Sequence, residues 1–162
     1  MPSLERVPSS TFIDWAWRLV LRVGFRCARV WWHIRRPRHE GALVAIYVGR
    51  DVLLVKSSYR AEWNFPGGSL HRDETPEAAA RREMEEEIGL SSGTALLPAG
   101  TASGVWDGRR DRVHFFELHL ERMPELRLDN REIVAARLVP PDELPGMALT
   151  EAVAAYLGGL PR

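Results

Sequence analysis

The chain has 162 residues, of which 45% are hydrophobic and 27% charged, and this composition is ordinary for one globular domain with an appendage. Its formal net charge is zero, yet residues 1–40 carry eight arginines against three acidic residues, so a segment of charge +5 precedes 122 residues of charge −5. The single cysteine, Cys27, excludes an intrachain disulfide, and arginines interrupt each N-terminal apolar run before it reaches the length of a membrane span. We therefore expect a cytoplasmic protein, with an organellar transit peptide as the alternative for the arginine-rich start.

Residues 11–36 are predicted to form one amphipathic helix with an unusually broad apolar surface. Its basic side chains recur at steps of three and four residues and therefore fall on one narrow face. They are Arg18, Arg22, Arg26, Arg29, His33 and Arg36. Aromatic and aliphatic residues cover most of the remaining circumference, which is wider than the apolar stripe of an ordinary surface helix. Pro37 closes the segment, so we take residues 1–39 as a basic helical arm and residues 40–162 as the main domain.

The main domain alternates strand patterns with helix patterns. Apolar runs predict strands at residues 41–48, 52–58, 112–120 and 132–139. Thr75 suits a helix N-cap and Gly89 a C-terminal stop, so a helix is expected at about residues 76–88. A closing helix is expected at residues 150–157, capped by Thr150. The order strands, helix, strands, helix predicts a mixed α/β domain.

The stretch RREMEEEIGL ends the first of these helices with four glutamates, although acidic side chains in the last turn oppose the helix dipole. At about 100° per residue, Glu83, Glu86 and Glu87 converge within about a quarter-turn, whereas Glu85 points to the opposite side. Such a cluster of oxygen ligands suits Mg²⁺ or Mn²⁺, and magnesium commonly binds substrate phosphates as well. The alternative is a solvated helix surface whose charges are balanced by i,i+4 ion pairs. Those pairs are Arg81–Glu85 and Arg82–Glu86.

The spacing around this stretch resembles a known family motif. Gly68 is followed by five residues, then Glu74, then seven residues, then REMEEEIGL. This is similar to the Nudix box, Gly-x5-Glu-x7-Arg-Glu-U-x-Glu-Glu-x-Gly-U with U apolar, and a gapped pattern of this length is specific. All seven fixed identities are present, and Met84 and Leu90 fill the apolar places. The box and its flanking strand pattern extend the resemblance over roughly residues 40–157 and leave the arm outside it.

The resemblance implies a Nudix hydrolase, an α/β/α sandwich with a mixed sheet that hydrolyses a nucleoside diphosphate linked to another moiety. It implies that Mg²⁺, with Mn²⁺ as a substitute, is held by the Gly68 carbonyl and the carboxylates of Glu83, Glu86 and Glu87. Glu74 and Arg82 would pair to hold the loop against the helix. Glu83 is the first candidate for the general base. Glu132 is the second, because relatives often bring a further acidic residue from this region; an ordinary loop carboxylate is the alternative.

Substrate choice is weakly encoded in the sequence. No Ser-Gln-Pro-Trp-type sequence follows the box, and no proline stands at the spacing expected of ADP-ribose enzymes. A nucleoside triphosphate or similar small nucleotide is therefore expected from the breadth of the family alone. Trp63, Asn64, Trp106 and Arg109 are candidate substrate-binding residues that would stack on a base or hold phosphate. Simple packing in the core is the alternative for the aromatic residues.

The arm has two competing interpretations. A broad apolar face with arginines and tryptophans suits a helix that lies on an anionic membrane surface through residues 11–36. It also suits a helix packed against the domain, or against its copy in a homodimer, with the arginines facing water; we favour this second interpretation. A different class of function is a non-catalytic nucleotide or RNA sensor of the same fold, whose arm docks to a membrane or a partner. The intact acidic cluster argues against it, and we do not expect nucleic acid to be a partner.

Overall fold

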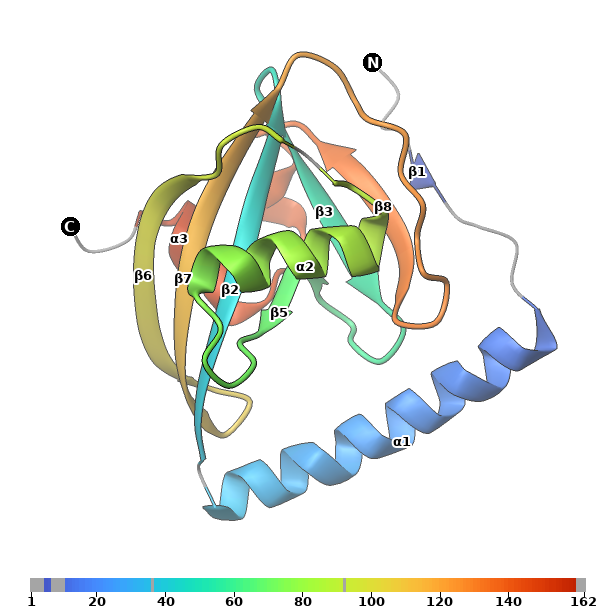
Figure 1. Cartoon of the computed structure of the whole chain (residues 1–162). Helices are drawn as coiled ribbons and strands as arrows, with labels where there is room; N and C mark the ends of the chain where they lie inside the picture. Colours follow the sequence, from blue (N-terminus) through green and yellow to red (C-terminus); the bar gives the residue numbers. More distant parts are fainter. Residues whose placement is uncertain (1–4, 7–10, 36, 92, 160–162) are drawn as a thin grey trace.

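The computed structural model describes residues 5–6, 11–35, 37–91 and 93–159, and it shows a twisted mixed sheet with helices on both faces (Figure 1). In these residues the helices are α1 (Phe12–Arg35), α2 (Pro76–Ile88) and α3 (Glu151–Leu157), with a 3-10 turn η1 at Leu144–Gly146. The strands are β1 (Glu5–Arg6), β2 (Arg38–Val48), β3 (Asp51–Ser57), β4 (Trp63–Asn64), β5 (Gly67–Ser69), β6 (Leu97–Trp106), β7 (Arg109–Leu120) and β8 (Ile133–Val139).

The long strand β2 organises the sheet. The described strands follow the order β1-β8-β3-β2-β7-β6, with β4 paired to β3 and β5 to β2; among them, β2 and β7 run parallel and the other neighbours antiparallel. On one edge, β2 pairs with β5 at residues 41–43 and with β3 at residues 46–48. Two strands therefore share that edge, and Gly68, the first residue of the box, lies in β5.

Alternate residues of the strands build a hydrophobic core on each face of the sheet. In β2, the side chains of Ala42, Val44 and Ile46 pack with those of α2, including Met84 and Ile88. The intervening residues of β2 face the other way and belong to the core beneath α3. This second core includes Leu43, Ala45, Leu54, Phe65, Phe115 and Val153. The two cores confirm the predicted α/β/α sandwich with a mixed sheet.

The sequence patterns predict the long elements and miss the short or exposed ones. α2 occupies the predicted range, whereas β4, β5 and β6 are not predicted. Of the ten residues of β6 only Ala102 is buried, so the strand shows no alternation between polar and apolar positions. β2 begins at Arg38, inside the segment assigned to the arm, because its first residues pair with β7. Thr150 is the N-cap of α3, but its hydroxyl donates to Asn64 Oδ1 at 2.8 Å and caps no helical N–H.

The helix α1 forms as predicted and lies along the edge of the domain, below α2 in Figure 1. The predicted Arg36 lies outside the described residues. Three arginine contacts hold the helix to the domain. Arg18 donates to the Asn130 carbonyl at 2.8 Å, Arg22 donates to the Ser58 carbonyl at 2.8 Å, and Arg29 pairs with Asp107 at 3.4 Å.

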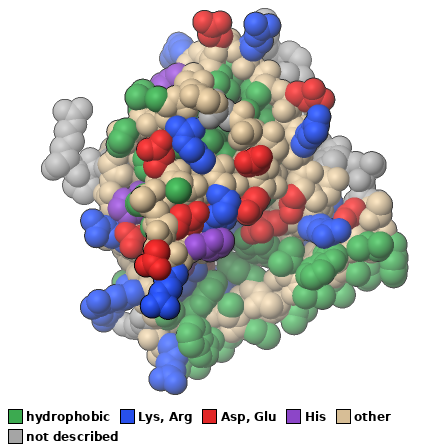
Figure 2. Space-filling model, viewed as in Figure 1, with side chains coloured by type: hydrophobic (Ala, Val, Ile, Leu, Met, Phe, Trp, Pro, Cys, Tyr) green, Lys and Arg blue, Asp and Glu red, His purple; other side chains and the backbone are tan. Residues whose placement is uncertain are grey.

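The orientation of α1 corrects one expectation. The expectation that the arginines face water is wrong for Arg18, Arg22 and Arg29. Packing of apolar side chains against the domain does occur, since the ring of Phe25 lies 4.9 Å from that of Tyr59. Guanidinium groups of α1 bind carbonyl oxygens and a carboxylate at loop ends, whereas none of the described α1 residues is buried. Other apolar side chains of α1 remain exposed, and Figure 2 shows hydrophobic side chains gathered along the helix.

Candidate functional site

Local sequence signals build the loop and the helix that carry the site. Thr75 is the N-cap of α2, and its hydroxyl accepts a hydrogen bond from the Ala78 N–H at 3.2 Å. Gly89 ends the helix in the left-handed conformation, with φ 66°. Gly67 has φ 136°, and a Cβ there would lie 2.2 Å from the Ala42 carbonyl oxygen. Gly67 therefore admits no side chain, and its close approach to β2 fixes the position of the loop.

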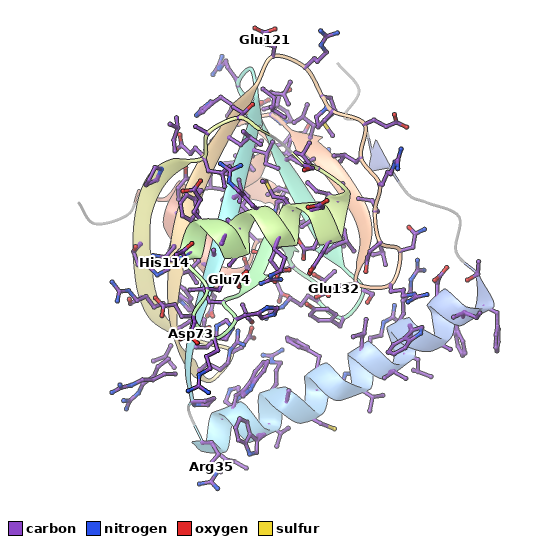
Figure 3. All side chains as sticks on the ribbon, in the orientation of Figure 1. Arg35, Asp73, Glu74, His114, Glu121 and Glu132 are labelled. Carbon is purple, nitrogen blue, oxygen red and sulfur yellow. The ribbon has the colours of Figure 1, made fainter. Side chains whose placement is uncertain are left out.

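The predicted pair of Glu74 and Arg82 is present. Arg82 Nε and Nη2 donate to the two carboxylate oxygens of Glu74 at 2.9 and 3.0 Å, and Nη2 also donates to the Ser69 carbonyl at 3.0 Å. The hydrogen bonds from Arg82 lower the pKa of Glu74 to about 2, so its carboxylate stays charged. This fork ties the loop before α2 to the helix itself, and Figure 3 shows Glu74 just below α2.

Three of the predicted acidic residues line one pocket: Glu83 and Glu87 from α2, and Glu132 from the end of the loop before β8. Glu87 is buried, with 8% of its surface exposed, and it accepts a hydrogen bond from the Gly67 N–H at 2.9 Å. Glu132 accepts a hydrogen bond from the Tyr59 hydroxyl at 2.6 Å, and in Figure 3 it lies between α2 and α1. Residues far apart in the sequence thus present carboxylates to one space.

Glu86 occupies a more open position than the other three carboxylates. Its side chain is 61% exposed, and it lies outside the pocket lining. Arg82 joins it to the site, because the same Nη1 nitrogen donates to Glu83 at 2.8 Å and to Glu86 at 3.3 Å. Glu85, one residue earlier, is exposed on the other side of the helix. The predicted Arg82–Glu86 pair is therefore present, and Arg81 pairs with Glu77 at 2.9 Å.

The carboxylates of the site repel one another. Burial raises the pKa of Glu83, although the Arg82 guanidinium opposes the rise, and the charges of Glu86 and Glu132 add to it. Burial also raises the pKa of Glu87 well above its usual range, and the charges of Glu132 and Glu83 add to that rise. Negative charge is thus concentrated where α2 faces the pocket, and a bound cation would relieve the repulsion.

The donor set fits a hard divalent cation in its chemistry, since it consists of carboxylate oxygens and one main-chain carbonyl. Gly68 packs directly against Glu83: a Cβ at Gly68 would stand 2.6 Å from a Glu83 carboxylate oxygen. Within residues 5–6, 11–35, 37–91 and 93–159, no three acidic, histidine or cysteine side chains lie together at metal-ligand distances. Binding an ion therefore requires side chains of α2 to turn toward one another.

The pocket, of about 1010 Å³, has two contrasting walls. The carboxylates form one wall, and basic and aromatic side chains of α1 and of the β6–β7 hairpin form the other. Of the predicted substrate-binding residues, Asn64, Trp106 and Arg109 line the pocket. Trp63 does not line it and instead packs against the core beneath α3.

Several residues of the second wall are not predicted from the sequence. Asp111, buried in β7, pairs with Arg109 at 3.4 Å and so helps to position its guanidinium. Arg109 stacks on the Trp32 ring of α1, 4.1 Å from the ring centroid, and Arg60 stacks on Phe25 at 4.6 Å. No motif marks these positions, and the docking of α1 brings Trp32 and Phe25 to the two arginines. The alternation of arginines and aromatic residues in α1 is the only sequence signal for them.

The comparisons with known proteins agree with this geometry. The NUDIX domain model matches residues 37–157 and leaves α1 outside. Diphosphoinositol polyphosphate phosphohydrolase 3-alpha of Mus musculus is 35% identical over 86 residues, 52% of this chain and 49% of the relative. An RNA pyrophosphohydrolase of Pseudomonas paraeruginosa is 38% identical over 66 residues, 41% of this chain and 40% of the relative. The chain thus spans half the length or less of these relatives. The crystal structure of a MutT NUDIX hydrolase from Burkholderia pseudomallei is similar with a TM-score of 0.66 and 25% identity, over 76% of this chain and 98% of that one.

Proposed function

The chain belongs to the NUDIX domain family, and from this premise we propose that it hydrolyses a diphosphate linkage in a nucleoside diphosphate derivative with the help of a divalent metal ion. A nucleoside triphosphate or similar small nucleotide is the first substrate to test. One observation carries the proposal: Glu83, Glu87 and Glu132 share a single pocket with Arg109. Carboxylates on one wall suit a cation, and a guanidinium on the other suits the phosphate groups that the cation accompanies.

Mg²⁺ is the ion that we propose, with Mn²⁺ as a substitute. The carbonyl of Gly68 and the carboxylates of Glu83, Glu86 and Glu87 would hold it, because such hard oxygen donors are the ligands that these ions prefer. When bound, an ion of this kind neutralises phosphate charge and makes water easier to deprotonate. Burial is the largest cause of the raised pKa values of Glu83 and Glu87, and neighbouring carboxylates add to the rise, so a bound cation would favour the charged forms.

The side chains of the chain supply the remaining steps. The oxygen of a water molecule bonds to phosphorus, and the bridging oxygen leaves with the electron pair of the broken P–O bond. A carboxylate must take the proton of that water. Glu83 is our first candidate for this base, and Glu132, which the Tyr59 hydroxyl orients, is the second. Arg109 lines the opposite wall, where it is placed to bind a phosphate oxygen.

Replacing Glu132 with glutamine is expected to lower kcat by about tenfold, a smaller loss than Glu83→Gln causes. Tyr59→Phe should cost less than Glu132→Gln, because it removes the 2.6 Å hydrogen bond to Glu132 and leaves the carboxylate in place. Steady-state kinetics of the three variants at saturating Mg²⁺ measure their kcat values and so rank the three losses. A larger loss in Glu132→Gln than in Glu83→Gln would reverse the assignment of the base.

The proposed activity is tested by phosphate release across a panel of substrates with Mg²⁺, with Mn²⁺ and with EDTA. The panel holds nucleoside triphosphates, ADP-ribose, NADH, diadenosine polyphosphates and sugar nucleotides. The names of the relatives add a diphosphoinositol polyphosphate and an RNA. We expect turnover of one class that EDTA abolishes. Failure of every substrate, with the protein folded and able to bind Mn²⁺, would reject the activity in favour of a non-catalytic nucleotide sensor.

A further inference from the structure

The outward face of α1 is apolar and uncovered. Five of its side chains fall within about 60° of one another around the helix axis, and each leaves between 48% and 80% of its surface exposed. They are Phe12, Leu19, Val23, Val30 and Ile34. Figure 2 shows hydrophobic side chains along the length of α1. A contiguous apolar surface of this kind is typical of a binding surface.

The charge exposed on α1 is positive. Asp14 is its one acidic residue. Its carboxylate accepts a hydrogen bond from the Thr11 hydroxyl and forms an ion pair with Arg131 of the domain. Among the described residues, Arg26 and Arg35 have no carboxylate within ion-pair distance. Arg26 borders the apolar face, and Arg35 ends the helix. The outward side of α1 therefore combines apolar and cationic side chains with no anionic one.

Tryptophans stand at both ends of the apolar face. Trp15 and Trp31 flank it on opposite sides, and about half of each side chain's surface is exposed. Indole rings favour the boundary between water and hydrocarbon, where the ring is desolvated and the N–H finds a polar partner. No helix in the described ranges is long and apolar enough to cross a bilayer. These features together are typical of a helix that lies in the plane of a membrane surface.

We propose that α1 binds the surface of an anionic lipid bilayer through this face. Anionic headgroups complement Arg26 and Arg35, and the acyl-chain boundary accepts the apolar side chains. A second copy of the chain complements the face poorly, because pairing two such helices brings arginines together without an acidic residue to balance them. The opposite face of α1 lines the pocket through Phe25 and Trp32, so the bilayer lies across the helix from the catalytic carboxylates.

Flotation of the full chain with vesicles tests the proposal without reference to activity. We expect binding to vesicles that contain phosphatidylglycerol, weaker binding to pure phosphatidylcholine, and weakening by salt. The double variant Val23→Gln with Val30→Gln should lower the partition coefficient at least about tenfold, because it removes two apolar side chains from the face and keeps good helix formers there. Leu97→Gln is the matched control: Leu97 is 52% exposed on β6, outside both α1 and the pocket lining.

The possible results distinguish a membrane from a second copy of the chain as the binding partner of the apolar face. Circular dichroism should show that both variants keep the helix content of the parent chain. If the folded parent chain fails to float with anionic vesicles, or if the double variant binds them as well as the parent, the proposal is overturned. A stable dimer that the double variant dissociates, without vesicle binding by the parent, would assign the face to a second copy; sedimentation velocity measures that state.

Discussion

Replacing Glu86 with glutamine is expected to lower kcat about 100-fold or more and to weaken Mn²⁺ binding, while the fold remains intact. The side chain is 61% exposed, and its contact with Arg82 at 3.3 Å is the kind of surface ion pair that contributes little to stability. The same substitution removes one of the negative charges that we assign to the cation, and charged oxygen ligands dominate affinity for such ions. Steady-state kinetics and a Mn²⁺ titration followed by electron paramagnetic resonance measure the two effects.

Glu85→Gln is the matched control for this variant. It makes the same chemical change one residue earlier, where the side chain is exposed on the other side of α2. We expect it to keep the turnover and the Mn²⁺ affinity of the parent chain, and thermal melting curves of all three proteins should coincide. Near-normal turnover in Glu86→Gln, with unchanged Mn²⁺ affinity, would remove Glu86 from the metal site and leave Glu83, Glu87 and Glu132 as its acidic residues.

The parts of the fold that depend on local chemistry are the ones that the sequence predicts. Thr75 caps α2 through its hydroxyl and Gly89 through its left-handed conformation, so the bounds of the helix follow from residues inside or beside it. The fork between Glu74 and Arg82 spans only eight positions and belongs to the motif itself. The site residues of α2 are predictable for the same reason. Once the helix is placed, the rotation of about 100° per residue determines which glutamates lie on the same face.

The parts that depend on long-range contacts are not predictable in this way. The strand β6 exposes most of its side chains, so its partner β7, and not its own pattern, makes it a strand. The face that α1 turns to the domain is decided by loop carbonyls, among them that of Asn130, 112 positions from Arg18. An amphipathic pattern alone predicts that apolar residues face protein. Here the acceptors at the pocket rim bring Arg18 and Arg22 to the domain as well, whereas Phe25 still faces it.

Gly68→Ala is expected to leave the protein folded and to lower kcat about 100-fold. A Cβ at this position would lie 2.6 Å from a Glu83 carboxylate oxygen and 2.9 Å from the other. These atoms end a flexible side chain, so the clash is relieved when the Glu83 carboxylate moves, and the backbone stays in place. A shift on the order of 1 Å in a catalytic group can cost about 100-fold in rate. Kinetics and Mn²⁺ titration of the purified variant provide the measurement.

Gly67→Ala is the contrasting substitution, because its neighbour is backbone and cannot move aside. Its Cβ would lie 2.2 Å from the Ala42 carbonyl oxygen, at a φ of 136° that side chains rarely adopt. The expected loss of about 3 kcal/mol or more in the free energy of unfolding should appear as a lower melting temperature. If Gly68→Ala proves as unstable as Gly67→Ala, its loss of activity is due to loss of folded protein and not to a displaced Glu83 carboxylate. If it melts like the parent chain and keeps full turnover, then the position of Glu83 against this glycine is irrelevant to the reaction, and Glu132 becomes the stronger candidate for the base.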